Sequence, residues 1–395
     1  MELKQALEAV IPSKRVKTNL IDVLAYSSDA GFYKLIPKAV VLPNSIEEIQ
    51  KLFQFSKTTN TPIVFRTGGT SLSGQSITDG ILVDLGKFWQ KVKVENEGDA
   101  IRVQPGLIGA MANAHLKKYK RKIGPDPSSI SAAMMGGIIA NNASGMCCGV
   151  KHNSYHTIKY ISIILPDGKK YNTEIKEDYS RFEKESDVLS IKLLEYRNDI
   201  LTNLQLVEKI RAKYLTKNTV GYSLNAFIDY EHPLDILAHL MVGSEGTLGF
   251  ISEAVLTTIP DYPFKATALL YFPDIYQACN AIVPLKEAGA EALELMDRAS
   301  LRSVESIKGV PEILKTLPKD TAALLCEFQT STKEELNEKL KAAEKLIQSF
   351  SLLQKPEFTQ ESEEQAFLWK IRKGMFPSVG ALRQQGTTVV LEDIA

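Results

Sequence analysis

The stretch PIVFRTGGTSLSGQS, residues 62–76, is the part of the chain from which the fold and function can be worked out. A short apolar strand opens here into a loop of Gly, Thr and Ser, which is typical of a cradle for a phosphorylated ligand. Gly68, Gly69 and Gly74 allow backbone angles that other residues avoid, and they let main-chain N–H groups approach an anion closely. Arg66, where the strand ends, adds a positive charge. Hydroxyl donors are contributed by Thr67, Thr70, Ser71 and Ser73.

Two well-known phosphate-binding motifs do not account for this loop. No Gly-Lys-Ser/Thr follows the spacer, so the loop is not a P-loop, and no GxGxxG is present, so it is not a dinucleotide fingerprint. An ordinary Gly/Ser turn between two strands is the plain alternative, because these residues punctuate turns in all classes of protein.

Length and composition exclude several classes of protein. A chain of 395 residues exceeds one ordinary core, so we expect two domains. Lys plus Arg and Asp plus Glu are both 47, which gives no basic excess for nucleic-acid binding. The sequence has no continuous apolar run of membrane-spanning length, and its N-terminus has no apolar signal region. Its four cysteines contain no CxxC, so we expect neither a disulfide framework nor an iron–sulfur site within this chain.

Hydrophobic patterning predicts an α+β domain followed by a second domain. A capping box at Ser45 and Glu48 predicts a helix, and the charged segment 176–217 predicts a solvated helical insertion. The pattern restarts after residues 261–263, which we interpret as the domain boundary. The predicted strands cover residues 39–42, 81–84, 92–94, 101–103, 158–165, 268–272 and 324–328.

Two further stretches are rich in small residues. GPDPSSISAAMMGGIIANNASGMCCG, residues 124–149, would let the backbone lie flat against a planar ligand, to which Asn141 and Asn142 could offer amide hydrogen bonds. A buried packing face made of small residues is the alternative. The third stretch, residues 241–260, has Gly243, Gly246 and Gly249 at GxxGxxG spacing, a weak signal by itself.

Taken together and in order, RTGGTSLSGQS, DPSSISAAMMGGIIANNASG and GSEGTLGFISE resemble the FAD-binding domain of the vanillyl-alcohol-oxidase (PCMH)-type flavoproteins. The stretches ANNASGMCCGVKHNSYHT and FLWKIRKGMFPSVGALRQQGTTVVLEDIA are most similar to the N-terminal part of the large iron–sulfur-containing D-lactate and D-2-hydroxyglutarate dehydrogenases. The resemblance implies an α+β fold. A two-subdomain FAD-binding domain would cover residues 1–260, and an α/β cap domain with an antiparallel sheet would cover residues 261–395.

By this resemblance the first loop wraps the FAD pyrophosphate, the second stretch lines the ribityl and isoalloxazine portion, and the third closes the site. The first-loop residues are Arg66, Thr67, Gly68, Gly69, Thr70, Ser71, Leu72, Gly74, Gln75 and Ser76. The second-stretch residues are Pro127, Ser128, Ser131, Gly136, Gly137, Asn142 and Gly145. The third-stretch residues are Glu245, Gly246 and Ile251. Some members attach FAD through a histidine in the first loop, and because this loop has none we expect non-covalent FAD.

Arg372, in FLWKIRKG, is the residue that we expect to handle the substrate. Related dehydrogenases place an arginine of this motif on the substrate carboxylate, which a guanidinium fork matches with two parallel hydrogen bonds. A helix-surface arginine is the plain alternative, because exposed arginine is common. His152 and His156 lie four residues apart, but without a third ligand we expect them to be structural and predict no metal site in this chain.

The chain departs from these relatives at its end. They continue past an EDIA-like strand into a half with an HxGDGNxH motif, whose histidines bind a divalent metal or act as the base. All five histidines of this chain lie at or before His239, and the sequence stops at Ala395. We therefore expect an N-terminal fragment with a truncated cap domain, inactive alone, whose base, divalent metal and iron–sulfur cluster belong to a missing part.

The leading hypothesis is FAD-dependent oxidation of a D-2-hydroxyacid, with hydride transfer to flavin N5 and a base that takes the hydroxyl proton. The alternatives are a glycolate-oxidase-like or alkyl-dihydroxyacetone-phosphate-synthase-like flavoenzyme, or a flavin-binding module without catalysis of its own. The expected partners are the hydroxyacid, an unidentified electron acceptor and a second copy of the chain, with no nucleic acid. We expect a cytoplasmic protein, with attachment to the inner membrane through the electron acceptor as the alternative.

Overall fold

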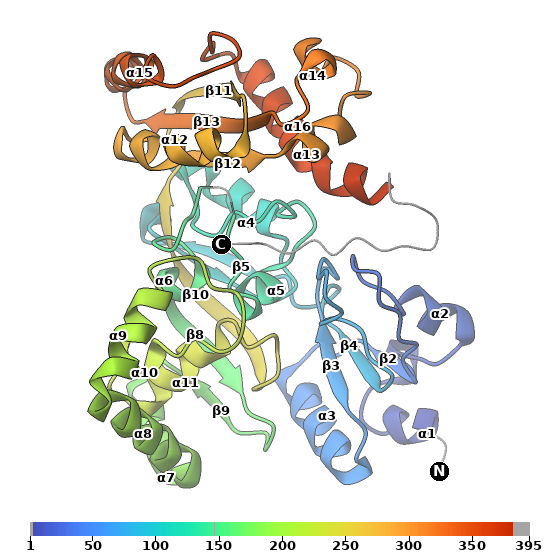
Figure 1. Cartoon of the computed structure of the whole chain (residues 1–395). Coiled ribbons are helices and arrows are strands. Elements are labelled where there is room, and N and C mark those ends of the chain that lie inside the picture. Colours follow the sequence, from blue (N-terminus) through green and yellow to red (C-terminus); the bar gives the residue numbers. More distant parts are fainter. Residues whose placement is uncertain (1–2, 146, 382–395) are drawn as a thin grey trace. The chain divides into compact units, whose positions relative to one another are not determined.

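The computed structural model describes residues 3–145 and 147–381. The chain divides into two compact units between Pro260 and Asp261 (Figure 1). The division falls between two consecutive long strands, β10 (Phe250–Pro260) and β11 (Phe264–Phe272).

The first unit opens with a four-stranded sheet in the order β1-β2-β4-β3, of which β2, β4 and β3 are parallel. Helix α3 (Ile46–Thr59) connects β2 to β3, and its predicted cap is confirmed, because the Ser45 hydroxyl accepts a hydrogen bond from Glu48 N at 3.3 Å. This strand–helix–strand unit delivers the chain to the Gly-rich loop. The strands are β1 (Val16–Lys17), β2 (Ala39–Val41), β3 (Ile63–Arg66) and β4 (Ile81–Asp84).

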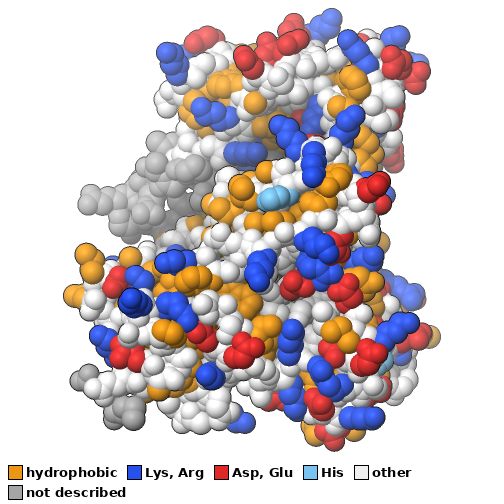
Figure 2. Space-filling model, turned by 180° about the vertical axis from the view of Figure 1, so that it is seen from behind, with side chains coloured by type: hydrophobic (Ala, Val, Ile, Leu, Met, Phe, Trp, Pro, Cys, Tyr) orange, Lys and Arg blue, Asp and Glu red, His pale blue; other side chains and the backbone are white. Residues whose placement is uncertain are grey.

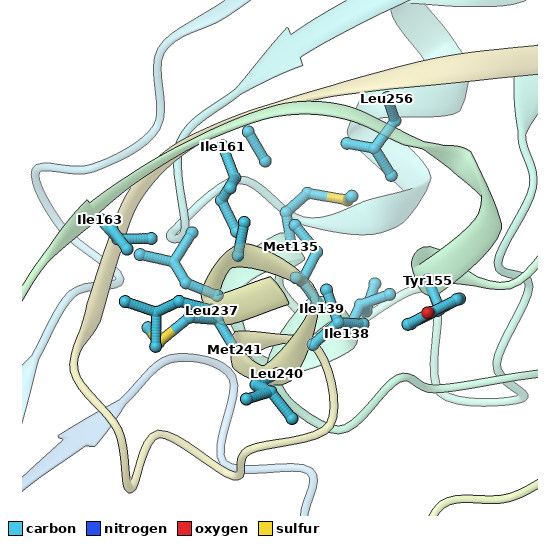
Figure 3. Packing of buried hydrophobic residues seen from close by; sticks show 14 of the residues in the cluster. Met135, Ile138, Ile139, Tyr155, Ile161, Ile163, Leu237, Leu240, Met241 and Leu256 are labelled. Carbon is cyan, nitrogen blue, oxygen red and sulfur yellow. The ribbon is translucent and has the colours of Figure 1, made fainter. Parts of the chain in front are cut away.

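A second, antiparallel sheet follows in the order β5-β6-β10-β8-β9, with β7 paired to the far end of β10. Helices α5 (Met135–Ala140) and α11 (Pro233–Met241) contribute to its core, where Figure 3 shows Met135, Ile139 and Leu237 close to Ile161. The remaining strands are β5 (Val92–Glu95), β6 (Ala100–Val103), β7 (Arg121–Ile123), β8 (Ile158–Ile164) and β9 (Lys170–Asn172).

The two sheets of the first unit share a core. Phe250 and Ile164, from the second sheet, belong to the apolar cluster of the first. The Phe250 ring lies 4.9 Å from the Phe65 ring and 5.1 Å from the Trp89 ring, measured between centroids. This aromatic contact joins β3, which leads into the Gly-rich loop, to the start of β10.

Helices fill the rest of the first unit. The segment predicted as a helical insertion forms α7 (Lys176–Glu185), α8 (Asp187–Thr202) and α9 (Leu204–Lys213). The shorter helices are α1 (Leu3–Glu8), α2 (Leu20–Ala25), α4 (Gly109–Leu116), α6 (Ser154–Thr157) and α10 (Ala226–Asp229).

The second unit is built on a three-stranded antiparallel sheet in the order β11-β13-β12 (Figure 1). Side chains alternate along β11, so that Leu270 faces one apolar cluster and Tyr271 the other. Helices α12 (Ile275–Glu287) and α15 (Lys333–Ile347) cover the first face. The second face is covered by α13 (Arg298–Ser303), α14 (Ile313–Thr316) and α16 (Ser362–Ala381).

One predicted strand of the second unit has different bounds in the structure, and another falls outside the described residues. The strand predicted over residues 268–272 begins at Phe264 in the structure. The prediction began too late because Lys265 and Thr267 interrupt the apolar run, although both residues pair with β13 (Ala322–Thr330). The sheet is completed by β12 (Ala292–Met296). The strand expected near the end of the chain lies outside the described residues.

Charge is evenly mixed on the face that Figure 2 shows. On the face that Figure 2 shows, basic and acidic side chains are interspersed, as expected from their equal numbers. Within the described part of the chain, no helix has both the length and the apolar character that crossing a bilayer requires.

Candidate cofactor site

The loop after β3 has the backbone of a cradle. Gly69 and Gly74 have φ of +63° and +81°, in the left-handed region that disfavours any residue with a Cβ. A Cβ at Gly68 would lie 2.5 Å from Ala132 O, and one at Gly69 would lie 2.5 Å from the Arg66 guanidinium. Each of the three glycines is thus needed for its φ angle, for close contact or for both.

Arg66 ties an N-terminal segment onto this loop. Its Nη1 donates to the carbonyls of Ser28, Tyr26 and Ser76 at 2.9, 3.3 and 3.4 Å. We call residues 26–31 the strap. Ala30 N donates to Gly69 O at 3.1 Å, which fixes the strap to the loop a second time.

The strap was not predicted from the sequence. Asp29 accepts hydrogen bonds from Gly31 N at 2.8 Å and from the Ser76 hydroxyl at 3.3 Å, and Gly31 lies directly against Leu72 O. An Asp two residues before a Gly is a local turn signal that could have marked a bend here. Nothing in that signal indicates contact with a loop about forty residues later.

The second stretch lies against the first loop. A Cβ at Gly137 would lie 2.9 Å from the Thr67 hydroxyl, and Gly68 faces Ala132 O. The Ser128 and Ser131 side chains are exposed. Gly136 packs against Pro105, and Gly145 packs against the backbone of Asp126, with no room for a Cβ in either place. The predicted second-stretch residues therefore include exposed positions and positions that are close-packed inside the protein.

Hydrogen bonds join the second stretch to the third. Gly243 N donates to Ile139 O at 3.2 Å, and Glu245 N donates to Ala140 O at 2.8 Å. The Asn141 amide donates to Glu245 Oε1 at 2.7 Å. Burial raises the pKa of the Glu245 carboxyl, and this hydrogen bond opposes the effect. The structure thus brings the three stretches together within the first unit.

Two predicted site residues of these stretches lie in the interior. Asn142 has φ of +52°, and its side-chain oxygen accepts a hydrogen bond from Tyr155 N at 3.0 Å. Ile251 is buried in the core of the second sheet. Asn142 therefore supports the backbone of the second stretch. Gly246, in the third stretch, faces open space, because a Cβ added there would have no neighbouring atom within 4 Å.

A buried polar cluster lies behind the second stretch. The Tyr155 hydroxyl donates to Asp229 Oδ2 at 2.8 Å, and the His239 ring stacks on Tyr230 with centroids 3.8 Å apart. His239 Nδ1 lies 2.8 Å from Asp235 O, which can only accept, so Nδ1 carries the proton. Burial lowers the pKa of His239.

Arg372 lies in the second unit, on α16. Its Nε and Nη2 contact Glu294 Oε2 on β12 at 2.7 and 2.6 Å. Its side chain is 31% exposed, so it is a half-buried, paired arginine and not a freely solvated one. The sequence analysis singled out Arg372 but did not identify Glu294.

The His152 and His156 pair brings no metal site together. Among the described residues, no group of three or more His, Cys, Asp and Glu side chains could hold a metal ion. The four cysteines form no disulfide.

Comparison with known proteins identifies both units. Residues 37–174 match the family described as "FAD binding domain", and residues 263–395 match "FAD linked oxidases, C-terminal domain". The chain belongs to the PCMH-type FAD-linked oxidases. The second match covers the whole of the expected cap domain, so it gives no support to the expectation that this domain is truncated.

The relatives of this FAD-linked oxidase act on different substrates. It is 28% identical over 307 residues to D-2-hydroxyglutarate dehydrogenase of Pantoea ananatis, which covers 73% of this chain and 28% of that protein. It is 24% identical over 383 residues to glycolate oxidase subunit GlcD of Escherichia coli, which covers 95% of this chain and 65% of that protein. The chain thus spans between about a quarter and two thirds of the length of these curated relatives.

Solved structures confirm the fold. An alkyldihydroxyacetonephosphate synthase superposes with a TM-score of 0.65 at 16% identity, covering 95% of this chain and 65% of that one. The predicted α+β architecture, with a PCMH-type domain followed by a cap domain containing an antiparallel sheet, is therefore correct.

Proposed function

We propose that this FAD-linked oxidase binds FAD non-covalently and oxidises a D-2-hydroxyacid of the D-lactate or D-2-hydroxyglutarate class. The observation that carries the proposal is the loop over residues 67–76, whose left-handed glycines and close backbone approaches suit a diphosphate. FAD, when bound, accepts a hydride from the Cα–H of the substrate. The first loop contains no histidine for covalent attachment.

The protein's own residues would hold the two reactants. The backbone N–H groups and hydroxyls of the loop would hold the FAD diphosphate, with Arg66 fixing the strap against them. The Arg372 guanidinium would hold the substrate carboxylate and so orient the hydroxyl-bearing carbon.

A second candidate is oxidation of glycolate, which the similarity to glycolate oxidase subunit GlcD supports over 95% of the chain. Glycolate carries the same carboxylate and hydroxyl as D-lactate and lacks the side chain, so Arg372 would bind either acid. An alkyl-dihydroxyacetone-phosphate-synthase-like flavoenzyme and a flavin-binding module without catalysis are the remaining alternatives.

Anaerobic reduction of the bound flavin tests the proposal. The FAD-loaded protein is mixed in turn with D-lactate, D-2-hydroxyglutarate, glycolate and, as a stereochemical control, L-lactate, while the flavin absorbance band is followed. We expect bleaching by one of the D-acids and none by L-lactate. This replaces the inactivity expected from a truncated cap domain, because residues 263–395 match the C-terminal domain of the FAD linked oxidases. Bleaching by glycolate alone would favour the second candidate. A yellow protein that no acid bleaches would contradict both candidates and leave a synthase-like flavoenzyme or a binding module.

A further inference from the structure

Polar side chains of helix α16 form hydrogen bonds with all three strands of the second sheet. The Gln365 amide donates to Lys265 O on β11 at 2.7 Å, and Trp369 Nε1 donates to Glu327 Oε2 on β13 at 2.5 Å. Arg372 then reaches β12. These positions are spaced i, i+4 and i+7, so they form one face of the helix. Arg372 is thus held on a rigid element in a fixed direction.

The contact between Arg372 and Glu294 uses one edge of the guanidinium. Nε and Nη2 form its side edge, and both meet the same carboxylate oxygen at 2.7 and 2.6 Å. The end edge is formed by Nη1 and the second hydrogen of Nη2. Among the contacts of the described side chains, none is a hydrogen bond from Nη1. The end edge, which can also give a carboxylate two parallel bonds, is therefore not used by the described side chains.

The other carboxylate on this face does not compete for Arg372. Glu327 is only 3% exposed, and its oxygens accept from Thr267 at 2.7 Å, from Gln329 at 2.6 Å and from Trp369. Three donors satisfy this buried carboxylate without help from the arginine. Arg372 is thus paired with Glu294, whose side chain is 16% exposed.

We propose that Glu294 is a positioning residue for the substrate arginine. By holding the side edge of Arg372, it presents the end edge to the carboxylate of the hydroxyacid. This proposal rests on the proposed function, because it takes Arg372 to be the group that binds the substrate. The ligand is the carboxylate of a small hydroxyacid, bound through one or both of its oxygens.

Substitutions at Glu294 separate positioning from simple charge competition. In the FAD-loaded protein, KM and kcat for the accepted D-hydroxyacid are measured for Glu294→Gln and Glu294→Ala. We expect Glu294→Ala to raise KM about tenfold and to lower kcat, because the fork loses its direction. Glu294→Gln should stay within about threefold of the wild type, since its amide oxygen still accepts from the same edge. The control is Glu291→Gln, which removes an exposed carboxylate just before β12.

A double variant shows whether Glu294 acts through Arg372. If it does, adding Glu294→Ala to Arg372→Lys should cause little further loss, so that the two effects are not additive. Additive losses, or the same fall in melting temperature with no rise in KM, would make Glu294 merely structural. A lower KM in Glu294→Ala would show competition with the substrate, which also contradicts positioning.

The outcomes distinguish the positioning role of Glu294 from the substrate role of Arg372, on which it rests. Unchanged kinetics in Arg372→Lys would overturn the substrate role of Arg372 and the positioning role with it. A raised KM in Arg372→Lys together with unchanged kinetics in Glu294→Ala would overturn positioning alone. Lys370→Gln, on the exposed side of α16, controls for the loss of one positive charge from the helix.

Discussion

At the scale of single residues, Arg66 directs its guanidinium to backbone carbonyls beside the Gly-rich loop. Its Nη1 donates to three backbone carbonyls, two from the strap and one from the loop itself. The guanidinium also lies over the Tyr26 ring, at 5.6 Å from the centroid. We infer that its main contribution to cofactor binding is to hold the strap and the loop in one arrangement.

Arg66→Lys tests this role. A lysine keeps the positive charge but cannot reach several carbonyls with a planar group, so we expect the Kd for FAD to rise about tenfold. The Kd is measured by titration of FAD fluorescence, with Lys34→Gln as an exposed charge control. Wild-type affinity in Arg66→Lys together with weak binding in Arg66→Gln would instead show that the charge itself matters.

His239 gives a prediction for pH. Burial holds its pKa below the ordinary value of 6.5, so the unfolded chain takes up a proton at a higher pH than the folded protein does. The contribution of His239 to stability is therefore complete above pH 6.5 and is lost as the pH falls from there to the lowered folded-state pKa. His239→Phe keeps the ring on Tyr230 and should flatten this part of the profile of unfolding free energy.

The matched control for this pH experiment is His115→Gln, which removes an exposed histidine on α4. Denaturant unfolding between pH 5 and 8 gives the unfolding free energy of each variant. An unchanged slope in His239→Phe, or the same flattening in His115→Gln, would contradict the assignment of the slope to His239.

At the scale of elements, the cradle loop and the turn between β8 and β9 offer a matched pair of glycines. Gly74 and Gly168 have φ of +81° and +87°, so alanine at either should cost roughly 1 to 2 kcal/mol. We expect similar losses of stability from Gly74→Ala and Gly168→Ala but weaker FAD binding only in the first. Equal FAD affinity in both variants would make the loop an ordinary turn.

The second element of interest, α16, combines two faces. Ile371 and Met375 are buried in the apolar cluster that includes α13 and α14, whereas Gln365, Trp369 and Arg372 contact the sheet through polar atoms. An apolar stripe alone would fix the helix against its neighbours. The polar contacts also fix its register on the strands, because each donor must reach one acceptor.

At the scale of the whole molecule, the chain has one tryptophan in each unit, Trp89 and Trp369. Single-tryptophan variants, Trp369→Phe and Trp89→Phe, therefore report separately on the first and second units. FAD at one hundred times its Kd should stabilise the unit that binds it by about 2.7 kcal/mol. We expect its melting midpoint to rise in Trp369→Phe, which reports on the cradle, and not in Trp89→Phe. Equal shifts would show that the two units unfold together.

The sequence by itself determined the features that depend on neighbouring residues. The Ser45 capping box and the strand entering the Gly-rich loop are encoded within a few positions, so pattern and propensity predict them. The three small-residue stretches, taken in order, resemble those of the PCMH-type flavoproteins, and this resemblance indicated an FAD-linked oxidase.

Only the tertiary structure decided which residues act on one another at a distance. Arg66 and Ser28 are 38 residues apart, Glu294 and Arg372 are 78 apart, and Asn141 and Glu245 are 104 apart. Many charged and amide side chains in the sequence could have made each of these bonds, and no local pattern distinguishes among them. The partner is selected by the packing of strands and helices, which brings one donor within reach of one acceptor and leaves the others in water.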